Sequence, residues 1–399
     1  MKKFIKQAGA VLTIGALLAG VTGCGSQAAP ANGSTAKSSG SGSSASSGGE
    51  IKIGLMADMT GPAALSGKEK LNGAQLAVDE INAAGGINGK KLKLVTEDDQ
   101  GTNQGGVASF QKLVSDPSIV AVVGSIRSTI VQATDTYVKK TQIPVMIGGT
   151  NPGLTHAGDK WVFRARPNDN YSSKALASYI TQDLKGKKVA ILHDTDAFGS
   201  AGGKLLDQDL KQMGATVVSD QGYTTATKDY TAYLENIKKS GADVLGTYMT
   251  NSEDAAQMIR QLRQLGLNIK VAGSPSIIDQ VTIKLAKQQL EGVYGVADFV
   301  TNGNDAAKKF TAAYKAKYGN NPDNYSSYPY DAINILANAM KKVGTDPNKL
   351  RQAILDTQHY QGAEGEYNFD KNGDGLHSYT VVEIKGGKVV PIKTVSFTN

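Results

Sequence analysis

Cysteine is nearly absent from this sequence, because Cys24 is the only one in 399 residues. One thiol excludes a disulfide within the chain and a cysteine-based metal site. Histidine is also scarce, and the four that occur have no spacing typical of metal ligands: His156, His193, His359 and His377. The folded part of the chain must therefore be stabilised by the packing of apolar side chains.

Catalytic motifs are missing as well. No Gly-x-Ser-x-Gly elbow occurs after residue 49. Residues 199–204 partly match a phosphate-binding loop, but Phe198 replaces its first glycine and Leu205 replaces the hydroxyl that holds magnesium. Residues 370–375 begin like a calcium loop, yet Val381 occupies the position of the bidentate glutamate, and a tight turn is favoured. We predict no catalytic residue, no metal site and no cofactor.

The N-terminus combines a basic start with a short apolar run. Lys2, Lys3 and Lys6 precede residues 8–21, which number about fourteen, whereas a membrane-spanning helix needs roughly twenty. A charged segment, a short apolar segment and small residues before a cleavage site are typical of an export signal. With Cys24 at its end, the segment resembles a bacterial lipoprotein signal, which implies a signal peptide at residues 1–23 and a lipid on the cysteine. An ordinary signal beside a chance cysteine is the alternative.

Residues 24–49 are predicted to be a flexible linker. Residues 25–49 are mostly Gly, Ser and Ala, with Lys37 as their only charge, and would span roughly 25–30 Å in root-mean-square terms. Such a segment would hold a folded body away from a membrane surface. Without residues 1–23, the 43 basic residues fall to 40 against 36 acidic ones, and neither sign forms a block. Charge therefore gives no indication of a nucleic acid partner.

The chain after residue 50 alternates between strand and helix patterns. Ile51, Ile53 and Leu55 predict a strand, and apolar residues spaced by three or four predict a helix at 67–84. A strand at 91–95 completes a β-α-β unit with parallel strands. Further strands are predicted at 119–123, 144–147, 188–192, 216–219 and 242–248, and further helices at 105–115, 129–140, 201–213, 229–239 and 253–265. This predicts an α/β fold of two doubly wound lobes, with ligands bound beyond the carboxyl ends of the strands.

Five stretches of the chain carry a resemblance to a known family. They are IKIGLMADMTGPAALSGKEKLNGAQLAVDEINAAGGINGKKL, IVAVVGSIRSTIVQAT, IPVMIGGTNPGLT, VAILHDTDAFGSAGG and FTAAYKAKYGNNPDNYSSYPYDAINIL. In this order they resemble the leucine/isoleucine/valine-binding proteins, the extracellular receptors of ABC importers, which have the type I periplasmic binding fold. The resemblance implies a monomer that serves an ABC permease. It also implies two lobes joined by three hinge crossovers around a cleft, here residues 50–166 with 300–377 and residues 167–299 with 378–399.

The resemblance also implies how a ligand carboxylate is held. In this family a hydroxyl after a strand and a threonine before an Asn-Pro pair bind it. Ser128 and Thr150 match those places, with the backbone of Gly148 and Gly149 beside them. Two hydroxyls and free amides near a helix N-terminus suit an anion, and Arg127 adds a cation. The alternative for Ser128 is that it only caps its helix.

Two aromatic residues match the pocket aromatics of the family. Phe198 fits the side chain of the second lobe that covers the ligand, and Tyr325 fits another pocket residue. Either ring can instead belong to the core, since large aromatic side chains are commonly buried there.

Three positions depart from the family pattern. Ser66 stands where an aromatic residue often shields the side-chain pocket, and Asn251 stands where a tyrosine is common. Residues 273–276, Ser274 among them, lack the acid that meets the ammonium group of an amino acid. Three acids elsewhere are candidates for that role: Glu253, Asp254 and Asp298.

These three departures from the family pattern leave the identity of the ligand open. We expect an amino acid of the branched-chain type or a related carboxylate, with an amine-free acid or an amide as the close alternative. An enzyme on the same lobes is disfavoured by the missing nucleophile and base. A sensory receptor that feeds a signalling partner stays open, since its bound state would look the same.

Overall fold

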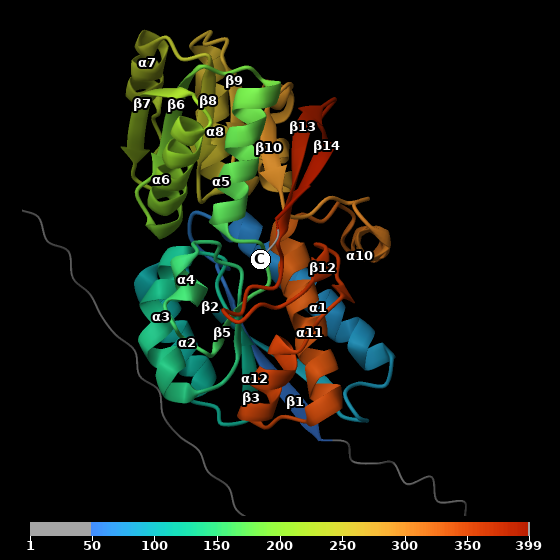
Figure 1. Cartoon of the computed structure of the whole chain (residues 1–399). Helices are drawn as coiled ribbons and strands as arrows, with labels where there is room; N and C mark the ends of the chain where they lie inside the picture. Colours follow the sequence, from blue (N-terminus) through green and yellow to red (C-terminus); the bar gives the residue numbers. More distant parts are fainter. Residues whose placement is uncertain (1–48, 398–399) are drawn as a thin grey trace, which may run out of the picture. The chain divides into compact units, whose positions relative to one another are not determined.

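The computed structural model describes residues 49–397 (Figure 1). Cys24, the predicted signal peptide at residues 1–23 and residues 24–48 of the predicted linker lie outside this range. The first strand begins at Glu50, where the folded body was expected to start.

The first sheet has five parallel strands in the order β2-β1-β3-β4-β5. Their bounds are β1 Glu50–Ala57, β2 Lys91–Asp98, β3 Ile119–Val123, β4 Val145–Ile147 and β5 Val162–Arg164. Apolar side chains leave both faces of these strands and meet helices on each side, as parallel sheets require. One face packs against α2 (Asn103–Val114) and α3 (Ser128–Thr141), and the other against α1 (Ala64–Ala83), α11 (Asn324–Val343) and α12 (Pro347–Leu355).

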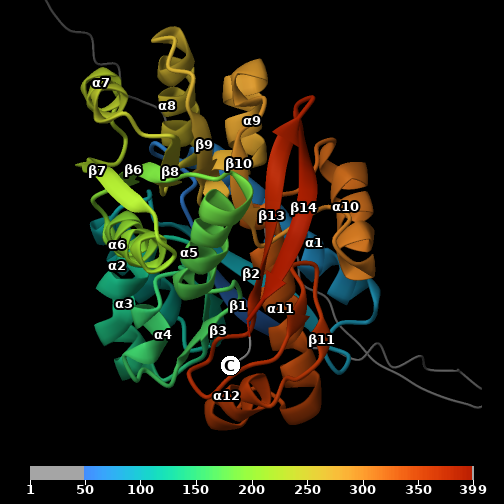
Figure 2. The same ribbon diagram turned by 45° about the horizontal axis from the view of Figure 1, so that its top comes forward.

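The second sheet has seven strands in the order β14-β13-β10-β9-β8-β6-β7. Their bounds are β6 Lys188–Asp194, β7 Thr216–Tyr223, β8 Val244–Tyr248, β9 Lys270–Gly273, β10 Tyr294–Ala297, β13 Ser378–Lys385 and β14 Lys388–Ser396. One face is covered by α5 (Asp169–Ser178) and α6 (Ala197–Gln212), and the other by α7 (Thr231–Ser240), α8 (Ser252–Gln264) and α9 (Gln280–Ala286). The hairpin of β13 and β14, red in Figure 2, pairs antiparallel with β10.

The prediction of two doubly wound α/β lobes is confirmed, and the chain changes lobes between β5 and β6, between β10 and α11, and between α12 and β13. The boundaries of the lobes themselves stay a prediction. The largest shift at a helix start is at α6, which begins at Ala197 instead of residue 201. Asp196 is its N-cap, and its carboxylate accepts hydrogen bonds from the backbone N–H groups of Phe198 and Gly199.

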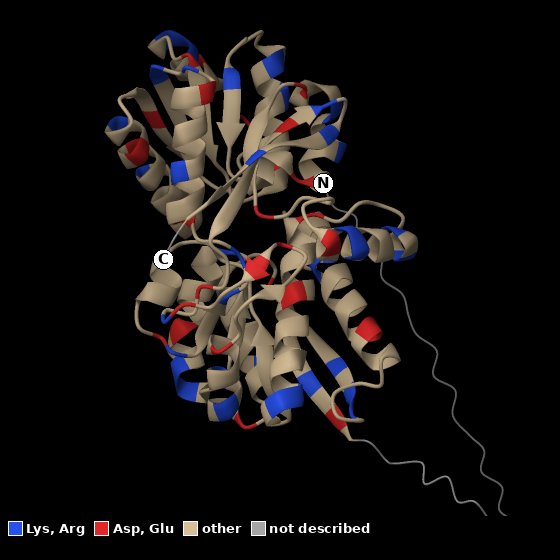
Figure 3. Ribbon diagram, turned by 45° about the vertical axis from the view of Figure 1, so that its right-hand side comes forward, with Lys and Arg blue, Asp and Glu red and all other residues tan. Residues whose placement is uncertain are grey.

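Lysine and arginine positions are interspersed with aspartate and glutamate positions along the outer helices (Figure 3). Within residues 49–397, no helix combines the length and apolar character needed to cross a bilayer.

Candidate functional site

A pocket lies where the carboxyl ends of strands from both sheets meet, as expected for open α/β sheets. Its lining comes from the loops after β3, β4, β5, β8 and β9 and from the first turns of α6 and α11. The lining residues are Ile126, Arg127, Thr150, Arg166, Phe198, Met249, Thr250, Pro275, Ser276, Asn324 and Tyr325. The space between them, counted together with its open mouth, is about 410 Å³.

Two buried arginines are the charged groups of this lining, and each pairs with a buried aspartate outside it. Arg127 Nε and Nη2 both lie 3.0 Å from Asp58 Oδ2. Arg166 Nε pairs with Asp298 Oδ2, and its Nη1 donates to the carbonyl oxygen of Gly148 at 3.0 Å. Burial acts to lower the pKa of both arginines, but the aspartates outweigh it and raise each pKa above its ordinary value. Both guanidinium groups therefore stay charged.

The loop after β4 supplies the hydroxyl of Thr150. Thr150 Oγ1 donates to Asp169 Oδ2 at 3.0 Å, and burial raises the pKa of Asp169 to about 6. Ser128, the first residue of α3, accepts a hydrogen bond from the backbone N–H of Asn151 at 3.2 Å. The N-cap residue of α3 is Arg127, and no side chain caps the helix there. Ser128 therefore ties the loop to α3 instead of capping that helix.

Two glycines allow this loop to lie close to its neighbours. A Cβ atom on Gly148 would lie 2.7 Å from the ring of Tyr328. A Cβ atom on Gly149 would lie 2.9 Å from Leu154 Cδ1 and 3.2 Å from the Cα atom of Ser128. A larger residue at either place would displace the loop from the start of α3.

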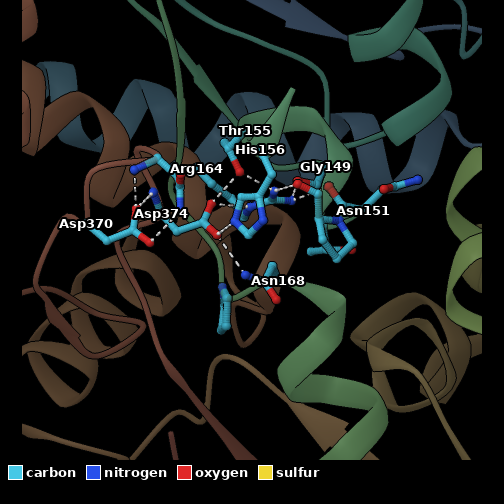
Figure 4. Close-up of polar contacts among 12 residues, drawn as sticks. Gly149, Asn151, Thr155, His156, Arg164, Asn168, Asp370 and Asp374 are labelled. Atoms are coloured by element: carbon cyan, nitrogen blue, oxygen red, sulfur yellow. Dashed lines mark hydrogen bonds and ion pairs between the residues drawn. The ribbon is translucent and has the colours of Figure 1, made fainter. Parts of the chain in front are cut away.

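Arg164, the last residue of β5, fixes the same loop (Figure 4). Its Nη1 donates to the carbonyl oxygens of Gly149 at 2.6 Å and Asn151 at 3.0 Å. Its Nε lies 2.8 Å from Asp374 Oδ1, and Asp374 also accepts from Asn168 Nδ2 at 2.7 Å. Arg164 is 0% exposed and Asp374 is 1% exposed. A buried ion pair thus holds the backbone that presents Thr150 to the pocket.

The turn that carries Asp374 is the one that begins like a calcium loop. His156, Asp370 and Asp374 each bring one potential ligand atom within 4.8 Å of the others. Asp370 Oδ1, however, accepts from the backbone N–H groups of Asn372 at 2.8 Å and Asp374 at 2.9 Å. Since the Asp374 carboxylate is taken by Arg164 and its neighbours, the cluster is the tight turn that the sequence favours.

The first turn of α6 covers the pocket from the side of the second sheet. The N–H of Ala197 donates to Thr129 Oγ1 at 3.0 Å, and its carbonyl oxygen accepts from Asn151 Nδ2 at 2.8 Å. Phe198 follows in the lining, and its ring centroid lies 5.4 Å from that of Tyr248. These bonds join the rims of the two sheets across the mouth of the pocket.

The structure brings most of the predicted site residues together. Four of the ten line the pocket, namely Arg127, Thr150, Phe198 and Tyr325. Three lie directly beside it through the contacts given above, namely Ser128, Gly148 and Gly149. The remaining three are buried outside the lining, namely Ser66, Asn251 and Ser274.

The three acids considered as ammonium partners also lie outside the lining. Asp298 pairs with Arg166, and Asp254 accepts from the backbone N–H of Ala226 at 2.8 Å. Glu253 lines a separate cavity near the start of α8, and burial raises its pKa to about 7.

Sequence reasoning missed Arg166 and Asn324. Arg166 follows the end of β5 by two residues, so its position just beyond a strand was a usable signal. Asn324 is the first residue of α11; with its amide oriented to satisfy its neighbours, its nitrogen donates to Asp279 Oδ1 at 2.6 Å and its oxygen accepts from Arg166 Nη2 at 3.0 Å. Nothing in the sequence around Asn324 indicates that contact.

The chain is similar to known proteins over most of its length. A family model described as "Periplasmic binding protein" matches residues 50–388. The chain belongs to this family. An amino acid binding protein of Pseudomonas aeruginosa is 32% identical to it over 343 residues, which are 84% of this chain and 90% of that protein.

Two solved structures place the family match in context. The substrate-binding protein LivJ of a branched-chain amino acid transporter from Streptococcus pneumoniae, in complex with isoleucine, is 26% identical with a TM-score of 0.81. The match covers 87% of this chain and 100% of that protein. A solute-binding protein of an ABC transporter from R. palustris, in complex with benzoate, shares the fold with a TM-score of 0.81 at 20% identity, over 87% of this chain and 97% of that one. The fold alone therefore does not decide whether a ligand carries an amine.

Proposed function

We propose that this periplasmic binding protein is the solute receptor of an ABC importer and binds a small carboxylate, either a branched-chain type amino acid or an amine-free analogue. The observation that carries the proposal is the pocket lining, in which Arg127 and Arg166 are the charged groups and Thr150 adds a hydroxyl. Guanidinium groups in a partly desolvated site favour carboxylates, which they bind through paired hydrogen bonds. The apolar side chains of Ile126 and Met249 in the same lining suit a short aliphatic group.

A thermal-shift screen tests the carboxylate proposal. The purified chain without residues 1–24 is heated with amino acids, 2-oxo acids, aromatic acids and amides. A carboxylate at a hundred times its Kd should stabilise the folded state by about 2.7 kcal/mol. No stabilisation by any carboxylate at millimolar concentration, with stabilisation by amides or sugars instead, would contradict the proposal.

Replacing Ser128 by Ala or Thr150 by Val is expected to weaken ligand binding without unfolding the protein. We propose that both hydroxyls bind the carboxylate, and a hydrogen bond to a charged group contributes about 1.5–3 kcal/mol. The expected loss of affinity is therefore about 10- to 150-fold for each variant, measured by calorimetry. Thr134→Val is a matched control, because the buried hydroxyl of Thr134 donates to Val131 O at 3.0 Å within α3. Unchanged affinity in both site variants would place the carboxylate elsewhere.

The proposal includes attachment to the outer face of the cell membrane through Cys24 and a monomeric receptor without catalytic activity. The basic and apolar segments before Cys24 and the Gly/Ser linker after it support the attachment. The absence of a positioned nucleophile and base from the pocket lining supports binding without turnover.

A further inference from the structure

The pocket offers many hydrogen-bond donors and few strong acceptors. Each guanidinium group has five N–H donors. Arg127 uses two of its nitrogens on Asp58, which leaves donors on Nη1 and Nη2. Arg166 uses one donor each on Asp298, Gly148 and Asn324, which leaves one N–H on each terminal nitrogen. The unused donors of the two arginines are available to a ligand in the pocket.

Three acceptors beside the pocket already take hydrogen bonds from protein groups. The carbonyl oxygen of Gly148 and the carboxylate of Asp298 accept from Arg166. The carbonyl oxygen of Met249 accepts from Ser276 Oγ at 2.5 Å. An ammonium group placed here would have to share the Gly148 carbonyl and the Asp298 carboxylate with the charged guanidinium of Arg166, and it would lie beside a like charge in a desolvated site.

Other carboxylates near the pocket face a different cavity. Asp279, Asp298 and Asp323 line a separate cavity, whose space including its opening to solvent is about 700 Å³. This cavity and the ligand pocket share only Asn324 among their lining residues. Asp279 also accepts from Ser252 Oγ at 2.6 Å. A small ligand in the pocket is therefore separated from these acids by the Arg166–Asn324 contact.

We infer that the pocket selects carboxylates that carry a second oxygen acceptor and no amine, such as 2-oxo acids with a short apolar side chain, and that Arg166 determines this choice. The inference rests on the proposed function and narrows its ligand class. One guanidinium binds the carboxylate, and the other donates to the neighbouring keto oxygen, so that both sets of unused donors are satisfied. In the corresponding amino acid, a positively charged α-ammonium group stands where the 2-oxo acid has its keto oxygen, so the acceptor is lost and a cation is added.

Calorimetry with matched ligand pairs tests the inference. Each pair consists of an amino acid and its 2-oxo acid: leucine, valine, phenylalanine and glutamate with their keto analogues. In the pair that binds the wild-type protein best, the 2-oxo acid is expected to bind about tenfold or more tightly than the amino acid. An amino acid that binds more tightly than its keto analogue overturns the inference and leaves the carboxylate receptor intact. No binding by any member at millimolar concentration overturns both the inference and the proposed function.

A paired substitution tests the role of Arg166. Arg166→Gln with Asp298→Asn removes both charges together, so that no unpaired charge stays buried. The preference for the 2-oxo acid is expected to fall by about tenfold or more. Lys52→Gln with Asp116→Asn is the control, because that ion pair (2.9 Å) lies outside the lining. An unchanged preference in a folded Arg166 variant would overturn the role of Arg166.

If the double variant fails to fold, Arg166→Lys is the second test. Because lysine keeps the positive charge, the affinity for the 2-oxo acid should fall while the preference over the amino acid is kept. A lost preference would overturn the inference.

Discussion

Replacing Asp374 by Ala is expected to lower the free energy of unfolding by about 3–5 kcal/mol. The substitution leaves the guanidinium of Arg164 buried without a charge partner, and breaking a buried pair costs this much. Asn168 Nδ2 also loses its acceptor. Chemical denaturation of wild type and variant measures the difference. Asp305→Ala is the control, since Asp305 pairs with Lys308 on the surface and its loss should leave the free energy of unfolding nearly unchanged.

The loss of stability in the Asp374→Ala variant should be accompanied by weaker ligand binding. Arg164 holds the carbonyl oxygens of Gly149 and Asn151, and Thr150 lies between them. Without Asp374, the guanidinium is free to turn toward solvent and release the loop. A variant that keeps its stability within about 1 kcal/mol would show that the ion pair does not stabilise the fold. A variant that loses stability while its ligand affinity is unchanged would show that Arg164 does not hold the loop of Thr150 in place.

The buried ion pair of Arg164 and Asp374 also predicts that the stability of the protein falls at acid pH. Burial acts to raise the pKa of Asp374, but Arg164, His156 and Asn168 outweigh it and hold this pKa well below its ordinary value. A depressed pKa in the folded state contributes stability above the unfolded value of about 4, and that contribution is lost as the pH falls below it. The difference in stability between wild type and Asp374→Ala should therefore shrink as the pH falls from about 4 to 2. A constant difference would contradict the ion pair as its cause.

The alternation of strand and helix was readable from the sequence, because buried parallel strands are continuous apolar runs and their helices have regular apolar spacing. Strand ends could be located for the same reason, and Arg127 and Thr150 follow two of them. The hairpin of β13 and β14 was harder to predict, since the side chains of β14 are mostly exposed and lack a clear pattern. The start of α6 was misplaced because the Asp196 cap lies before a run of small residues.

Long-range polar pairs could not be predicted from the sequence alone. Arg166 and Asp298 are 132 residues apart, and Arg164 and Asp374 are 210 residues apart. Periodicity gives the element to which each residue belongs, but the crossovers decide which strand ends meet. The second pocket cation, Arg166, therefore needed the fold, whereas Arg127 and the two hydroxyls were reached from the sequence.

Membrane attachment is predicted to depend on Cys24. Cys24→Ala is expected to leave an uncut precursor or to release the protein, because the cysteine is the proposed site of both cleavage and lipid attachment. A single acyl chain gives only marginal membrane binding at about 0.8 kcal/mol per buried methylene, so a stable anchor requires more than one chain on this residue. Membrane fractionation followed by mass determination separates precursor, released and anchored forms. Ser26→Ala is the control and should stay anchored.

Ligand binding by the soluble body should be unaffected by the same substitution. The described fold begins at Glu50, and the pocket lining lies between residues 126 and 325, far along the chain from Cys24. The Gly/Ser linker has little apolar surface with which to pack on the body. The purified Cys24→Ala protein is therefore expected to bind its carboxylate with wild-type affinity. A Cys24→Ala protein that stays firmly in the membrane at the mature mass would contradict lipid attachment through this cysteine, and the short apolar segment would then have to act as the anchor instead.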